Sequence, residues 1–169
     1  MQVDVYTRCE KVSLHLNGEK IGTKETNKKN KFTASFKVPY KEGSLKASAY
    51  NGNELIDTFT IQTVMEPVKL KLTADRTNIK ANNQDLSYIT VELVDEKGLC
   101  SPFAQKMVEF DISGPGKIIA VGSSNPKSDE SFQLKKRTTF QGRCIAIVKS
   151  AEVKGNITLT AKSKDLPDS

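Results

Sequence analysis

The chain has 169 residues, of which 37% are hydrophobic and 27% charged, with no Trp and a formal net charge of +6. The length suits one large or two small domains, and the lean apolar content favours thin β layers over a large enzyme core. Because acidic residues are interleaved with basic ones along the chain, the charge is typical of a solvated surface, and we expect no nucleic-acid groove.

The N-terminal part of the sequence alternates apolar and polar residues with a period of two, which predicts strands with one buried and one wet face. These runs are Val12 to Leu16, Phe32 to Val38, Leu45 to Ala49 and Leu55 to Ile61. Asp57 interrupts the last run and is expected to mark a bend. Asn17-Gly18 predicts a tight hairpin, because both residues tolerate positive φ. The basic run from Lys24 to Lys31 is interpreted as a solvated hairpin tip.

The pattern restarts at "TVMEPVKLKL". Pro67 has no N–H to donate to an inner ladder, so it belongs at the first residue of a strand or at a junction. We therefore place a domain boundary at Val64 to Glu66, giving domains of residues 1–65 and 66–169. Because the linker is short, we expect a rigid tandem.

The second part predicts a longer set of strands. They are Val68 to Ala74, Ile89 to Leu93, Val108 to Ile112, "KIIAV", Phe132 to Leu134, "RCIAIVKS" and Ile157 to Ala161. "RCIAIVKS" is expected to be central, with both faces covered. Short strands with turns every roughly 8 to 12 residues indicate a β-sandwich. The predicted fold is all-β, with two sandwiches in tandem.

Candidate catalytic groups are sparse. His15 is the one histidine, and it lies on the polar phase of a strand beside no nucleophile, so we expect no catalytic triad. The paired carboxylates Asp95-Glu96 and Asp129-Glu130 lie on turns, where we expect them to diverge and stay solvated. A glycosidase instead needs two carboxyl groups facing each other across a cleft. We predict no catalytic residue.

The sequence also predicts no metal or cofactor site. Cys9, Cys100 and Cys144 lack metal-ligand spacing, and free buried thiols are expected, although a Cys100–Cys144 disulfide remains open. Phosphate-cradling glycine motifs are absent. The sequon Asn156 to Thr158 is discounted as a chance match.

The sequence contains little that indicates a membrane span or a sugar-binding surface. No apolar run reaches the roughly 18 residues of a membrane span, and "QVDVYT" after Met1 is no leader, so we expect a soluble piece of a longer polypeptide. A glycan platform would need exposed aromatic residues. Trp is absent, and the four tyrosines are scattered: Tyr6, Tyr40, Tyr50 and Tyr88. The segment around Phe103 is either an interface loop or a buried plug.

Two segments nevertheless have recognisable motifs. "VYTRCEKVSLHLNGEKIG" with "FKVPYKEGSLKASAYNGNE" resembles the immunoglobulin-like domain that follows the catalytic barrel in bacterial β-galactosidases of glycoside hydrolase family 2. "KLKLTADRTNIKANNQDLSYITVELVDEKG" with "TFQGRCIAIVKS" is similar to the invasin-type immunoglobulin-like domain that comes next in those enzymes. Arg8 replaces the more usual Asn, and the loop Gly122 to Glu130 lacks the family's second glycine.

The resemblance implies two tandem immunoglobulin-like sandwiches from the C-terminal part of an exported bacterial glycosidase. Its catalytic glutamates would lie upstream, in a barrel of about 250 residues that this chain cannot contain. The implied partners are the catalytic and other domains of the same polypeptide, with a glycan or a second copy as further options. A cell-surface adhesin segment and a carbohydrate-binding module remain the alternatives.

Overall fold

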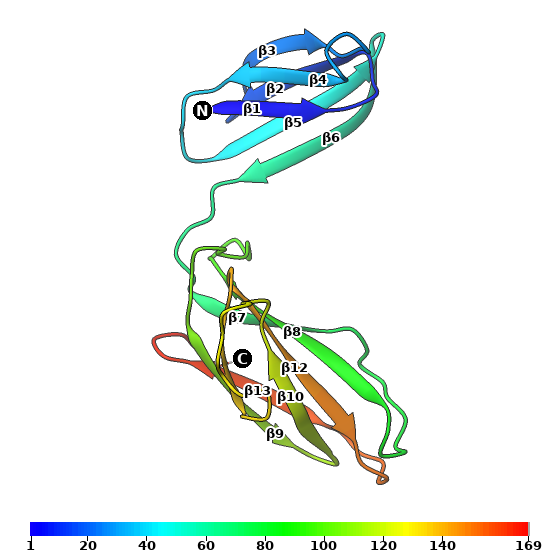
Figure 1. The fold of residues 1–169 in the computed structure, drawn as a ribbon, viewed down its shortest axis with the longest axis vertical. Helices are drawn as coiled ribbons and strands as arrows, with labels where there is room; N and C mark the ends of the chain where they lie inside the picture. The colour runs from blue at the N-terminus through cyan, green and yellow to red at the C-terminus, as the bar shows by residue number, and fades with distance from the viewer. Residues whose placement is uncertain (169) are drawn as a thin grey trace. The chain divides into compact units, whose positions relative to one another are not determined.

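The computed structural model describes residues 1–168, which form thirteen strands and, over that range, no helix. The predicted all-β class is confirmed. Contacts divide the chain into two compact units, the N-terminal unit Met1–Thr63 and the C-terminal unit from Val64 onward (Figure 1).

The N-terminal unit is a sandwich of two antiparallel sheets. Its strands are β1 (Gln2–Tyr6), β2 (Lys11–Leu16), β3 (Glu19–Glu25), β4 (Thr33–Lys37), β5 (Ser44–Asn51) and β6 (Glu54–Gln62). One sheet has the order β3-β2-β5-β6, and the other consists of β1 and β4. The two-stranded sheet packs on β2 and β3 through β4.

Alternation along β2 and β4 places the core of this unit between the two sheets. The buried residues are Val12, Leu14, Leu16, Ala34, Phe36, Val38 and Leu45. The predicted hairpin joins β2 to β3, with positive φ at Asn17 (52°) and Gly18 (84°). Both values suit the right-handed twist of the flanking strands.

The C-terminal unit is a larger sandwich. Its strands are β7 (Lys69–Ala74), β8 (Leu86–Val94), β9 (Met107–Ser113), β10 (Gly116–Gly122), β11 (Lys136–Thr138), β12 (Arg143–Ser150) and β13 (Thr158–Ser163). A sheet of order β10-β12-β8-β7 faces a sheet of order β11-β9-β13. The buried core is Leu70, Val91, Leu93, Val108, Phe110, Val121, Cys144, Ala146 and Ala161.

Two details of the predicted strands were wrong, and a third lies next to its predicted position. Phe132 to Leu134 forms a turn, and the ring of Phe132 stacks 4.9 Å from the guanidinium carbon of Arg137 instead of entering the core. The irregularity expected at Asp57 is found one residue earlier in β6: Ala49 stands opposite Asp57 and Tyr50 opposite Leu55, which leaves Ile56 as an extra residue. β12 is central, but only one face is fully buried, because within this unit no further layer covers the outer face of its sheet.

Candidate functional site

A cleft of about 1080 Å³ opens at one end of the C-terminal sandwich. Its apolar floor comes from the ends of neighbouring strands, with Leu72 of β7, Ile89 of β8 and Val148 of β12. The loops β7–β8 and β12–β13 form the polar rim. The cleft thus combines a hydrophobic floor with side chains from loops that lie far apart in the sequence, which is the usual make-up of a small-molecule site.

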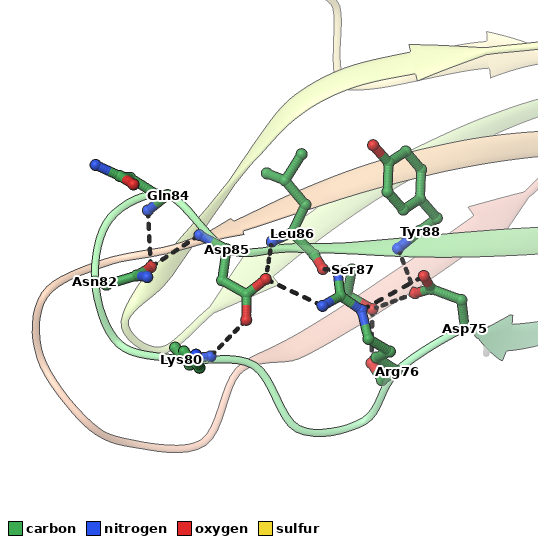
Figure 2. Close-up of polar contacts among 9 residues, drawn as sticks. All are labelled: Asp75, Arg76, Lys80, Asn82, Gln84, Asp85, Leu86, Ser87 and Tyr88. Carbon is green, nitrogen blue, oxygen red and sulfur yellow. Dashed lines mark hydrogen bonds and ion pairs between the residues drawn. The ribbon is translucent and has the colours of Figure 1, made fainter.

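Asp85 fixes the shape of the β7–β8 loop (Figure 2). Its carboxylate accepts hydrogen bonds from the backbone N–H groups of Lys80 (2.8 Å) and Leu86 (3.1 Å), and it pairs with Arg76 Nη1 at 3.1 Å. The Lys80 N–H is the main cause of a lowered pKa at Asp85, against the opposing effect of burial. The loop is therefore held by an ionised carboxylate at neutral pH.

Asp75 holds the other side of the same loop. It accepts hydrogen bonds from the Tyr88 backbone N–H (2.7 Å) and the Ser87 hydroxyl (3.3 Å), and the Tyr88 bond is the main reason its pKa is lowered. Arg76 Nε lies 3.7 Å from this carboxylate. Because Arg76 sits between two carboxylates and donates to the Leu86 carbonyl, its charge is already compensated (Figure 2).

The remaining polar groups of the cleft favour binding over hydrolysis. Lys80 and Lys154 contribute cations to the lining, and the residues that form it include no Asp or Glu. Ser150, at the end of β12, is buried, and its hydroxyl has no hydrogen-bond partner within residues 1–168. A buried hydroxyl without a partner can bind a water or a ligand. The cleft does not supply the two opposed carboxyl groups that glycoside hydrolysis commonly requires.

The sequence prediction missed this cleft. Ser150 was predicted only as part of a strand, and the sequence offered no reason to single out Lys80 or Lys154. The three residues are brought together by two loops and a strand end, and no spacing in the sequence reports that proximity.

His15 differs in one respect from the prediction. Its Nδ1 lies 3.3 Å from the Ser13 hydroxyl, so a hydroxyl does stand beside it. Residues i and i+2 of β2 share a face, which explains the contact. Ser13 is buried, and the hydrogen bonds found for the described residues include no carboxylate on His15. Among the described residues, the pair therefore lacks two features of a hydrolytic triad: a solvent-accessible serine hydroxyl and an acid that orients the histidine.

The expectation that both carboxylate pairs stay solvated was wrong for Asp95, which is buried, and Glu130 is only partly exposed. Asp95 is completely buried and accepts hydrogen bonds from the backbone N–H groups of Leu99 (2.9 Å) and Met65 (3.2 Å). Burial by itself raises the pKa of Asp95, but these N–H groups and that of Lys97 outweigh it, and the net pKa is lowered. Asp95 therefore ties the start of this unit to the turn after β8.

Glu130 pairs with Arg137, which is the largest fully buried side chain among the described residues. Its carboxylate lies 3.5 Å from Nε of Arg137, whose side chain is only 1% exposed. Arg137 also donates to Ser123 Oγ (3.2 Å) and the Glu130 carbonyl (2.8 Å). Hydrogen bonds from Thr138 are the main cause of the lowered pKa of Glu130. The pair fixes the loop between β10 and β11, which is a structural role.

All three cysteines have free thiols. Cys144 lies in the core, where burial raises its pKa to about 12, and burial likewise raises the pKa of Cys100. A thiol that stays protonated at neutral pH is a poor nucleophile and a poor metal ligand. Residues 1–168 contain no cluster of three or more His, Cys, Asp or Glu able to hold a metal ion. Within the same range, there is no helix that is long and apolar enough to cross a membrane.

A second candidate region is β6. Leu55, Phe59 and Ile61 were expected to form the buried face of a strand, yet all nine residues of β6 are exposed. The sequence did contain one sign that this strand is unusual. Ile56 adds an apolar residue out of phase with Leu55, Phe59 and Ile61, and the strand carries no Lys, Arg or Pro. Phe103 is 98% exposed, so its interpretation as a buried plug was wrong.

Comparison with protein families identifies both parts of the chain. Residues 70–169 match Glycoside hydrolase family 2 C-terminal domain 5, and residues 1–56 match a domain of unknown function (DUF4982). Beta-galactosidase BoGH2A of Bacteroides ovatus is 34% identical over 161 residues, covering 95% of this chain and 19% of that protein. A beta-glucuronidase of Formosa agariphila is 32% identical over 97% of this chain and 17% of its own length.

Solved structures of glycosidases are likewise similar to this chain over nearly its whole length. A glycosyl hydrolase family 2 member from Bacteroides cellulosilyticus is 43% identical with a TM-score of 0.94, covering 99% of this chain and 22% of that chain. A beta-glycosidase from Bacteroides vulgatus is 26% identical with a TM-score of 0.90, covering 100% of this chain and 22% of the other. The chain spans about a fifth of the length of the curated relatives it matches.

Proposed function

The chain belongs to glycoside hydrolase family 2, as a C-terminal part of such an enzyme, and we propose that it is a non-catalytic pair of immunoglobulin-like domains supporting a β-galactosidase. The longer enzyme is called the parent enzyme below. One observation carries the proposal: the match runs through both units of the chain yet covers only about a fifth of each relative. The remaining four fifths leave room for a catalytic domain elsewhere in the parent enzyme.

The geometry of the described residues supports a role without chemistry. Asp95 and Glu130 are engaged in holding loops, and the lining of the cleft has no acid. Two different families match the two halves, whereas a surface adhesin built from repeats would show two similar halves. Support of the parent enzyme is therefore favoured over an adhesin segment.

The test is an activity assay on the isolated chain and on the parent enzyme. The relatives carry both beta-galactosidase and beta-glucuronidase names, so both chromogenic β-galactosides and β-glucuronides should be supplied. We expect turnover by the parent enzyme and none by the isolated chain. Heat-labile activity that copurifies with the isolated chain would overturn the non-catalytic role.

Glycan binding is a second candidate, and the cleft beside Ser150 is the observation that favours it. Its lining offers amide, hydroxyl and ammonium groups over an apolar floor but no aromatic ring for stacking on a sugar. Affinity electrophoresis on galactan and related polymers measures such binding. Unchanged migration would exclude a carbohydrate-binding module, while retardation that Ser150→Ala or Lys154→Ala abolishes would support it.

We also propose that the parent enzyme is exported by a bacterium, in keeping with the bacterial sources of the relatives. Fractionation of cells that produce the parent enzyme tests this. Activity in the periplasm or at the outer surface is expected, and activity confined to the cytoplasm would refute it.

A further inference from the structure

β6 is an edge strand whose apolar side chains are left in solvent. Leu55 is 53% exposed, Ile56 48%, Phe59 72% and Ile61 51%. Single exposed apolar residues are ordinary, but a contiguous set on one strand marks an interaction surface. Phe59 and Ile61 share one side of the strand with Asp57, whereas Leu55 stands opposite Tyr50 on the other side. We call Phe59 and Ile61 the β6 face.

The β6 face continues the inner face of its own sheet. Phe59 stands opposite Ala47 and Ile61 opposite Leu45, and Leu45 belongs to the buried core. The covering sheet has only two strands, and it packs on β2 and β3. Figure 1 shows β6 at the border of the unit with no strand drawn across it. The sandwich therefore ends before its inner apolar face does.

Other edge strands of the chain are protected by charge. β7 carries Lys69 and Lys71, and β3 carries lysines and glutamates along its length. Such charges keep an exposed edge from associating with other chains. β6 has no Lys, Arg or Pro, and its two acids, Glu54 and Asp57, leave the segment from Thr58 to Gln62 with Phe59 and Ile61 but no charge.

We propose that the β6 face is a docking surface for the part of the parent enzyme that precedes this chain. The inference rests on the proposed function, because it requires that upstream part to exist. The inference adds which surface of the chain contacts the parent enzyme that the chain supports. The contact is made by side chains packing on Phe59 and Ile61. Strand addition is disfavoured because the Asp57 carboxylate already accepts the Thr58 N–H at 2.7 Å, which blocks the middle of the edge.

The size of the surface favours a tethered partner over a second copy. A nine-residue strand is about 30 Å long at about 3.3 Å per residue, and with its neighbour it presents about 300 Å². A stable interface between separate molecules buries about 800 Å² per partner. A segment of the same polypeptide is present at a high effective concentration, so a small contact suffices.

Hydrogen exchange locates the contact directly. Amides of residues 54–62 should exchange about tenfold more slowly or better in the parent enzyme than in the isolated chain, while those of β3 change little. Some β6 amides are bonded to β5 in the isolated chain as well. Protection there as strong as in the parent enzyme would overturn the proposal, whether it comes from a second copy or from the C-terminal unit. A sedimentation experiment on the isolated chain separates these two sources. Equal exchange in both samples would also overturn it.

Substitution of Phe59 gives a second test of docking. Phe59→Ser should leave the Tm of the isolated chain unchanged and lower the Tm of the parent enzyme. The control is Phe103→Ser, which changes a phenylalanine that is 98% exposed and lies outside the β6 face, and it should change neither Tm. Loss in both samples would mean that Phe59 stabilises its own unit, and loss in neither would mean that the face is unused. Both results contradict docking and leave the proposed function intact, which instead fails if the parent enzyme has no glycosidase activity.

Discussion

The two units close their sandwiches to different extents. In the C-terminal unit, three strands cover four, and even the edge strand β7 buries Leu70. In the N-terminal unit, two strands cover four, and the edge strand β6 buries nothing. The C-terminal unit completes its own core, whereas the N-terminal unit leaves the inner side of β6 uncovered within the unit. This difference is why the docking proposal concerns the N-terminal unit.

The largest effect is expected from a core phenylalanine of the closed unit. Phe110→Ala should lower the free energy of unfolding of the C-terminal unit by about 3 to 5 kcal/mol, because it removes a buried ring from the centre of β9. Denaturant unfolding followed by NMR signals from each unit measures the loss separately. An effect below about 1 kcal/mol would show that this core is looser than its burial indicates.

The buried cation of the same unit comes next. Arg137→Met should lower the stability of the C-terminal unit by about 3 kcal/mol, since it removes the partner of Glu130 and two hydrogen-bond donations inside the protein. Arg143→Met is the control. Arg143 pairs with Glu92 at 2.9 Å, but its side chain is 58% exposed, so a change within about 1 kcal/mol is expected. Similar losses for both variants would contradict the role assigned to burial.

Acid should affect the two units unequally. The pKa values of Asp75, Asp85, Asp95 and Glu130 are lowered in the C-terminal unit, against Asp4 in the N-terminal unit, over the residues described. A carboxyl group whose pKa is lower when folded stabilises the protein above its unfolded pKa, and that stability is lost as the pH falls through the folded value. Below about pH 4 the C-terminal unit should therefore lose more stability than the N-terminal unit.

Unfolding midpoints of each unit between pH 2 and pH 7 measure this difference, and Asp95→Asn should flatten the curve of the C-terminal unit alone. A steeper acid response in the N-terminal unit would contradict the assignment.

The smallest effect is expected on β6. Phe59→Ala should change the stability of the isolated chain by no more than about 0.5 kcal/mol, because the ring is already 72% exposed. The same unfolding measurement applies, with Phe110→Ala as the contrast. A loss of about 2 kcal/mol or more would mean that the β6 face is covered within the isolated chain.

Local sequence determined much of this protein. Alternation along β2, β4 and β8 predicted the buried faces, and Asn17-Gly18 predicted its hairpin. Such features depend on strand period and backbone sterics, which neighbouring residues dictate. The motifs of both segments likewise identified the family from the sequence alone.

Tertiary structure decided which apolar faces are covered and which charges are buried. Phe110 lies on the central strand β9 beneath a four-stranded sheet and is buried, whereas Phe59 lies on the edge strand β6 opposite a two-stranded sheet and is exposed. Asp95 and Glu130 looked like solvated turn residues until backbone N–H groups and Arg137 were folded around them. Burial and charge pairing arise from contacts between residues distant in the sequence, and a local pattern carries no record of those contacts.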